Sequence, residues 1–113
     1  MPYVCLNTSE KLSENQKEKV KSEIGRLITV IPGKTEEVTI VDISDGRSMY
    51  KGGKAAPCAY VDIRVYTKAD PEGKRRFAEE LFAVLEGELG IHKDNVYMSV
   101  LEFEHWGDHG TYH

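Results

Sequence analysis

Pro2 has the most unusual chemistry in this sequence, because it directly follows the initiator methionine. Aminopeptidases usually remove an initiator methionine when the next side chain is small, so we expect the mature chain to begin with the secondary amine of Pro2. That amine would be the one backbone nitrogen able to act as a base, and a strand starting at the next residue would hold it at the edge of a sheet. The alternative is purely structural, since proline also suits the first position of a strand.

For Lys34 and Tyr97, the residues alone favour ordinary structural roles. Lys34 follows Gly33 in a predicted loop, where a lysine is ordinarily a solvated surface group. Tyr97 lies on a predicted strand, where a tyrosine usually packs with its hydroxyl at the rim of the core. If Lys34 approaches Pro2, its charge would favour the neutral form of the amine. Both interpretations stay open for each residue.

The tail carries histidines at four-residue steps, His105, His109 and His113. This spacing could gather imidazoles around a metal, but Gly107 and Gly110 argue against a helix there, and no cysteine or carboxylate set completes a site. We expect a solvated tail, no metal and no cofactor. Gly52-Gly53 also lacks the strand-to-helix setting of a phosphate-binding loop.

The composition indicates an ordinary globular protein with one domain, residues 1–113. The formal charge of -4 and the scattered basic residues predict no nucleic-acid partner. No apolar run is long enough for a membrane span and no signal peptide is evident, so we expect a cytoplasmic protein, with export without a signal peptide as the alternative. Cys5 and Cys58 are far apart and are interpreted as reduced core residues.

The elements that must position these residues form two similar runs. Residues 3–8 alternate as a strand, and Ser13 with Gln16 has the spacing of a capping box at a helix start. Pro32-Gly33 ends that helix, and residues 38–44 predict the next strand. The buried helix stripe is Val20, Ile24, Leu27, Ile28 and Ile31.

The second run begins after a turn at Asp45-Gly46 and a short return strand at 47–50. Residues 57–66 alternate and predict the central strand, and Asp70-Pro71 starts a helix that Gly90 ends. Residues 96–103 predict the last main strand, and 104–113 a loop or short edge strand. The stripe of this helix is Phe77, Leu81, Val84, Leu85 and Leu89.

Strand, helix and strand therefore occur twice, at an offset of about 55 residues. Both units can be right-handed βαβ crossovers, which predicts an α/β (α+β) fold with a four-stranded mixed sheet and two helices on one face. The opposite face keeps apolar side chains that need cover, and a homo-oligomer would provide it.

This pattern resembles the tautomerase superfamily and, within it, the macrophage migration inhibitory factor family. No single element is specific, but the order and spacing together are. The matching residues are Pro2, Asn7-Thr8, Gly33-Lys34, Met49 with Gly52-Gly53, Pro57-Cys58-Ala59, Lys68, and Asp94 with Val96-Tyr97.

The resemblance implies a homotrimer with active sites between subunits. It also implies a cofactor-independent isomerase, a tautomerase whose substrate is either an aromatic α-keto acid such as phenylpyruvate or dopachrome. Pro2 would be the catalytic base, and Lys34 would hold the substrate carboxylate. The backbone N–H of Tyr66 would donate to the substrate. Further substrate contacts would come from Tyr97 of the adjacent subunit, Ser99, and Tyr112 at the pocket mouth.

Departures from the family pattern leave two other functions open. Ser99 replaces the usual asparagine, Tyr66 replaces a smaller aliphatic residue, and Val61 replaces the second cysteine of a CxxC, so thiol-disulfide activity is not supported. The main alternative is a cytokine-like binding protein with weak or vestigial turnover and a protein receptor. A dehalogenase or decarboxylase would need extra arginines and a carboxylate, and the sequence does not locate such a set.

Overall fold

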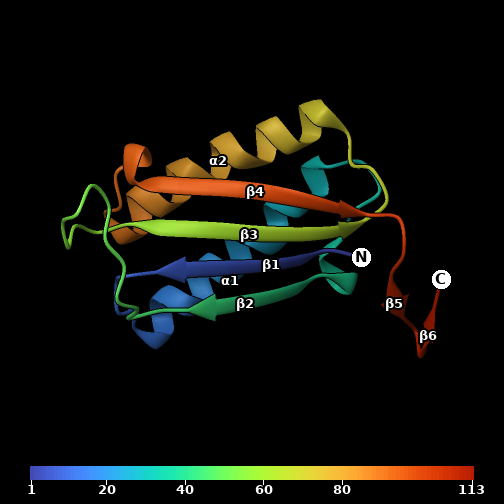
Figure 1. The fold of residues 1–113 in the computed structure, drawn as a ribbon, viewed down its shortest axis with the longest axis horizontal. Coiled ribbons are helices and arrows are strands. Elements are labelled where there is room, and N and C mark those ends of the chain that lie inside the picture. The colour runs from blue at the N-terminus through green and yellow to red at the C-terminus, as the bar shows by residue number, and fades with distance from the viewer.

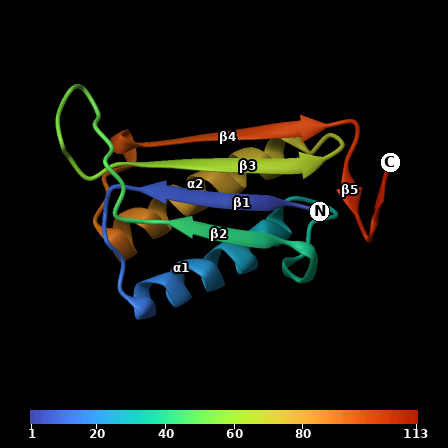
Figure 2. The ribbon, with the colours of Figure 1, turned by 60° about the horizontal axis from the view of Figure 1, so that its bottom comes forward.

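The computed structural model describes all residues from 1 to 113, and its main feature is a four-stranded sheet backed by two helices (Figure 1). Figure 2 shows both helices on the same side of the sheet. The strands are β1 (Tyr3–Thr8), β2 (Ile40–Ser44), β3 (Ala59–Tyr66) and β4 (Val96–Phe103), and the helices are α1 (Glu14–Leu27) and α2 (Pro71–Leu89). Three short 3-10 turns lie at Ile28–Val30, Glu36–Val38 and Lys93–Asn95.

The sheet confirms the predicted pair of βαβ units. Its order is β2-β1-β3-β4, with β1 parallel to β2, β3 parallel to β4, and the two central strands antiparallel. Tyr3 and Ala59 begin the first strands of the two units, and Ile40 and Val96 begin the second strands, so both pairs repeat at an offset of 56 residues. The mixed sheet follows from joining two parallel units through their first strands.

Both helices start as their sequences predict. Ser13 accepts from the N–H of Gln16, and the Gln16 side chain accepts from the N–H of Ser13, which completes the capping box. Asp70 caps α2 by accepting from the N–H of Gly73 at 2.8 Å, with Pro71 at the first helical position. Gly90 ends α2 with a left-handed φ of 69°.

The core lies between the helices and one face of the sheet. Every residue of the predicted α1 stripe is buried, and so are Phe77, Leu81 and Leu85 of α2, whereas Val84 and Leu89 are only partly buried. Even-numbered residues of β1 and odd-numbered residues of β3 face this core, as the alternation predicts: Val4, Leu6, Val61, Ile63 and Val65.

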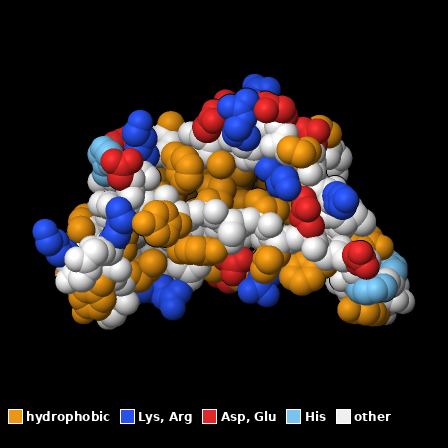
Figure 3. Space-filling view, turned by 45° about the horizontal axis from the view of Figure 1, so that its top comes forward, with side chains coloured by type: hydrophobic (Ala, Val, Ile, Leu, Met, Phe, Trp, Pro, Cys, Tyr) orange, Lys and Arg blue, Asp and Glu red, His pale blue; other side chains and the backbone are white.

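The opposite face of the sheet keeps large hydrophobic side chains in the open. They are Ile40, Tyr60, Tyr97, Leu101 and Phe103. Figure 3 turns the β4 and α2 edge of the molecule forward and shows hydrophobic side chains at the surface below the charged outer side of α2. The exposed hydrophobic residues of the open face are the uncovered apolar surface that the sequence predicts.

The predicted return strand at 47–50 is wrong. After the turn at Gly46, the N–H of Arg47 donates to the carbonyl of Thr8 at 3.0 Å, so the chain crosses the end of β1 instead of returning along β2. A single bridge between Lys51 and Lys54 then closes over Gly52-Gly53, both with positive φ.

The predicted strand boundaries and tail also need correction. β2 starts two residues later than predicted because residues 36–38 form a 3-10 turn, and β3 starts at Ala59. The tail does not join the sheet as an edge strand; it forms a separate hairpin of β5 (Gly107–Asp108) and β6 (Thr111–Tyr112). His109 and Gly110 both have positive φ, which is the geometry of a tight hairpin turn.

Candidate functional site

Pro2 lies buried at the start of β1, at the end of the sheet where the tail hairpin also lies (Figure 1). Its carbonyl accepts from the N–H of Ile40 at 3.0 Å, which ties the N-terminus to β2. Continuing the antiparallel register of β1 and β3 places Pro2 opposite Val65 and Met1 opposite Tyr66. The sheet therefore brings the predicted base and the predicted Tyr66 contact together.

Lys34 reaches this end of the sheet through the loop that follows α1. Its N–H donates to the carbonyl of Ile31 at 3.0 Å, and the residue is half-buried. The same loop packs tightly on α2, because a Cβ on Gly73 would lie only 3.0 Å from the Cα of Ile31 and the Cδ of Pro32. Glycine at the first turn of α2 thus permits the backbone contact that positions Lys34.

The N-terminal amine has an electrostatic environment that favours its neutral form. In the structure this amine belongs to Met1. Partial burial lowers its pKa, the ammonium of Lys34 lowers the pKa further, and the carboxylate of Asp108 acts in the opposite direction. Desolvation and a neighbouring cation are the two conditions that make an amine available as a base near neutral pH.

The tail hairpin packs beside this amine through the side chain of Tyr66. The Tyr66 ring stacks on Trp106 with centroids 6.4 Å apart and on His113 at 5.7 Å. Trp106 and His113 exchange two backbone hydrogen bonds of 3.0 and 2.9 Å, and the imidazole of His113 is 2.6 Å from the carboxylate of Asp108. These contacts order the tail as a hairpin, most of whose residues are exposed to solvent as expected, and Asp108 lies near enough to the N-terminus to act on its amine.

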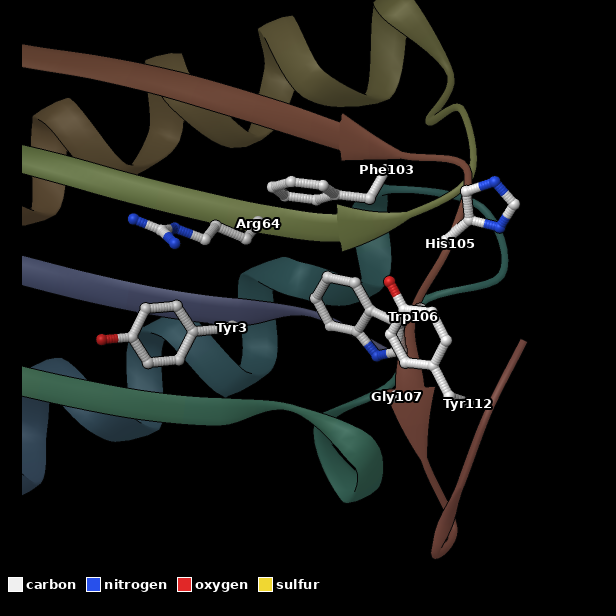
Figure 4. A pocket seen from close by; sticks show the side chains of 7 residues that line it. All are labelled: Tyr3, Arg64, Phe103, His105, Trp106, Gly107 and Tyr112. Atoms are coloured by element: carbon white, nitrogen blue, oxygen red, sulfur yellow. The ribbon is translucent and has the colours of Figure 1, made fainter.

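A groove of about 510 Å³ opens on the uncovered face of the sheet at the same end. Figure 4 shows Tyr3, Arg64 and Phe103 on the neighbouring strands β1, β3 and β4, with Trp106 and Tyr112 of the tail beside them. Tyr112 lines the groove with 73% of its surface exposed. The full lining is Tyr3, Arg64, Phe103, His105, Trp106, Gly107 and Tyr112.

Tyr97 and Ser99 lie elsewhere in the chain. Tyr97 is the second residue of β4, six residues before Phe103, which corresponds to roughly 20 Å along the strand. The residue is 59% exposed, and the Lys51 ammonium lies 5.8 Å from the centroid of its ring. The hydroxyl of Ser99 is hydrogen-bonded to that of Tyr60 across the strands. One chain therefore brings together Pro2, Lys34, Tyr66 and Tyr112, but not Tyr97 and Ser99.

Sequence reasoning missed three residues at this end: Arg64, Trp106 and Asp108. The arginine and the carboxylate are groups that the sequence had not located near Pro2. His109-Gly110 between two short polar segments is a turn signal that could have revealed the hairpin. The approach of Asp108 to the N-terminus depends on where that hairpin packs, and no local pattern encodes this.

The structure shows no group of three His, Cys, Asp or Glu side chains placed to hold a metal ion. Cys5 and Cys58 are both free and buried. Neither helix combines the length and apolar character that crossing a bilayer requires.

The chain matches the family described as macrophage migration inhibitory factor over residues 1–111. Among individual proteins, D-dopachrome decarboxylase-B of Xenopus laevis is 27% identical over 114 residues, covering 98% of this chain and 96% of the relative. A macrophage migration inhibitory factor homolog of Brugia malayi is 25% identical over 107 residues, covering 92% and 90%.

Solved structures show the same fold over the whole chain. The crystal structure of Leishmania major MIF2 superposes with a TM-score of 0.92 at 23% identity, covering 100% of this chain and 97% of that one. The structure of Pt0534 inactivated by 2-oxo-3-pentynoate has a TM-score of 0.85 at 18% identity, covering 96% and 93%.

Proposed function

The chain belongs to the macrophage migration inhibitory factor family of the tautomerase superfamily, and we propose that it is a cofactor-independent keto–enol tautomerase acting on small aromatic α-keto acids such as phenylpyruvate. The observation that carries this proposal is the N-terminus, which is partly buried beside Lys34 so that its amine has a lowered pKa. Removal of Met1 would leave the amine on Pro2, which is buried.

Pro2 is the general base of the proposed reaction. The neutral amine takes a proton from the carbon next to the ketone, the electrons of that C–H bond form a carbon–carbon double bond, and the proton returns to the carbonyl oxygen to give the enol. The ammonium of Lys34 holds the substrate carboxylate, which keeps the reacting carbon within reach of the nitrogen. The N–H of Tyr66 donates to the substrate. Positioned proton transfer of this kind contributes about a hundred- to ten-thousand-fold in rate.

A second copy of the chain completes the proposed site. Tyr97 is roughly 20 Å along β4 from the end of the sheet that holds Pro2, so it reaches a Pro2 amine only on a neighbouring chain. Ser99 lies on the same strand and accompanies it. The exposed apolar face of the sheet provides surface for such contacts, and a homotrimer with sites between subunits is the arrangement that we propose.

One protein of the same fold was inactivated by 2-oxo-3-pentynoate, which is a small α-keto acid and supports the proposed substrate class. One similar protein is described as a D-dopachrome decarboxylase, whose substrate is a cyclic quinone acid of a different class. D-dopachrome is therefore the second substrate to assay, with its product identified by mass.

The experiment compares phenylpyruvate tautomerisation by the processed protein, by protein that retains Met1, and by the Pro2→Gly variant. Pro57→Gly is the matched control, because Pro57 precedes the corresponding strand of the second unit and lies exposed in a loop. We expect activity in the processed protein and the control, and its loss in the other two. Equal rates in all four proteins would remove Pro2 from the mechanism.

A binding protein with weak turnover is the second candidate. It is favoured by Ser99, whose hydroxyl already bonds to Tyr60 and is shorter than the amide usual in the family. Turnover near the uncatalysed rate, together with a homotrimer that binds a defined receptor, would favour this candidate over the enzyme.

A further inference from the structure

The groove on the open face of the sheet adjoins the N-terminus from two directions. Tyr3 lines the groove and directly follows Pro2, while Gly107 lines it and directly precedes Asp108, whose charge acts on the amine. At about 510 Å³ the groove has the size of a small-molecule site. A ligand in the groove therefore lies over β1, β3 and β4, beside the N-terminus.

Arg64 is the one side chain with a permanent charge in the lining of this groove. Its Nε and one terminal nitrogen donate to the carboxylate of Asp62 at 3.4 and 3.2 Å, which orients the guanidinium. The other terminal nitrogen has no hydrogen-bond partner within the chain, and about half of the side chain is exposed. An ion pair at such a surface is weak, so the guanidinium retains donors for an anionic ligand.

Aromatic rings surround the arginine and give the groove a preference for planar ligands. Trp106 contacts Phe103 with ring centroids 5.8 Å apart and stacks on Tyr66, so its position is held from both sides. The hydroxyl of Tyr3 donates to Asp42 at 2.7 Å, so this ring presents mainly its apolar surface to the groove. Figure 4 shows the Arg64 side chain between the rings of Tyr3 and Phe103, with Trp106 and Tyr112 on the side of the tail.

We propose that the groove selects aromatic α-keto acids with a second acidic group on the ring: the ring packs against Trp106, and Arg64 binds the distal carboxylate. This rests on the proposed function, in which Pro2 and Lys34 bind the α-keto acid end of the same molecule. Arg64 is then a specificity-determining residue, since it acts on the part of the substrate that does not react.

Binding can be measured without catalysis in the Pro2→Gly variant. The chain has a single tryptophan, Trp106, so its fluorescence reports directly on the groove. We expect terephthalate to quench this fluorescence saturably and to bind about tenfold more tightly than benzoate, as one added charge-assisted contact allows. In an Arg64→Gln, Pro2→Gly double variant the two acids should bind equally. The proposal is wrong if terephthalate and benzoate bind equally to the Pro2→Gly variant. It is also wrong if the double variant, which lacks Arg64, keeps the preference for terephthalate.

Turnover provides the second readout. We expect a higher kcat/KM for 4-carboxyphenylpyruvate than for phenylpyruvate. Arg64→Gln should lower the ratio of these two kcat/KM values by about tenfold, because only 4-carboxyphenylpyruvate has the ring carboxylate that binds the guanidinium. Arg75→Gln, an exposed arginine on α2, is the matched control and should leave the ratio unchanged. A ratio that survives Arg64→Gln contradicts the inference even if Pro2 proves essential. Failure of the Pro2 test with intact terephthalate selectivity contradicts only the proposed enzyme activity.

Discussion

Replacing Gly73 with alanine tests whether the packing of α2 positions Lys34. The added methyl group would lie 3.0 Å from the Cα of Ile31 and the Cδ of Pro32, and 3.1 Å from the carbonyl oxygen of Val30. All three atoms belong to backbone or to a proline ring, so none can rotate away. The loop that carries Lys34 must shift instead.

The expected loss of stability follows from two opposing effects. Overpacking of a close contact costs about 1–3 kcal/mol. Alanine is favoured over glycine within a helix by about 0.8–1.0 kcal/mol, which offsets part of that cost. We therefore expect Gly73→Ala to lower the free energy of unfolding by about 0–2 kcal/mol.

Gly87→Ala is the matched control in the same helix. No atom lies within 4 Å of a Cβ placed there and the residue is exposed, so only the conformational gain remains, about 0.4–1 kcal/mol of added stability. Urea unfolding of both variants at one protein concentration gives the comparison, because the stability of an oligomer depends on concentration.

Phenylpyruvate turnover then tests the link to the site. We expect kcat/KM to fall about tenfold or more in Gly73→Ala, since a displacement of about 1 Å can cost a hundredfold. Gly87→Ala should match the parent protein. If Gly73→Ala is as stable as its control and equally active, the contact between α2 and the loop does not position Lys34.

Three further predictions concern charge and packing. Activity should rise with pH as the N-terminal amine loses its proton. Lys34→Ala should raise the pKa of the amine and move this rise to higher pH, whereas Asp108→Asn should lower the pKa and move the rise to lower pH. Profiles of kcat/KM against pH measure both shifts. The Glu102 carboxylate accepts hydrogen bonds from the Lys74 ammonium and from the N–H of Ala69, and both lower the pKa of Glu102. The stability that this carboxylate contributes is therefore complete above the unfolded pKa of about 4.3 and is lost as the pH falls through the lower pKa of the folded state. Glu102→Gln should thus reduce stability at pH 7 and make a progressively smaller difference below pH 4, measured by urea unfolding at both. Phe77→Ala should cost about 3–5 kcal/mol in the same assay, because the ring is fully buried in the core.

Much of the fold was predictable because its signals are local. The capping box at Ser13, the Asp70-Pro71 helix start and the alternation along β1 and β3 each depend on residues within a few positions of one another. Arg47 to Tyr50 had the same local character and was predicted wrongly. The N–H of Arg47 has a competing partner, the carbonyl of Thr8 at the end of β1, which is distant in the sequence.

The candidate site was predictable only in part. Pro2, Lys34 and Tyr112 were identified from position and resemblance, and the structure brings them to one end of the sheet with Tyr66. No local pattern marks Arg64, because the role that we propose for it depends on the groove beside the tail.

The sequence by itself determined the two βαβ units, because helix caps, apolar periodicity and turn residues are properties of short segments. Only the tertiary structure decided which charged groups surround the N-terminal amine. Lys34 and Asp108 are 74 positions apart, and their opposing effects on one pKa arise from the packing of a loop and a hairpin against the same end of the sheet. Electrostatic interaction depends on distance in space, which the order of residues along the chain does not specify.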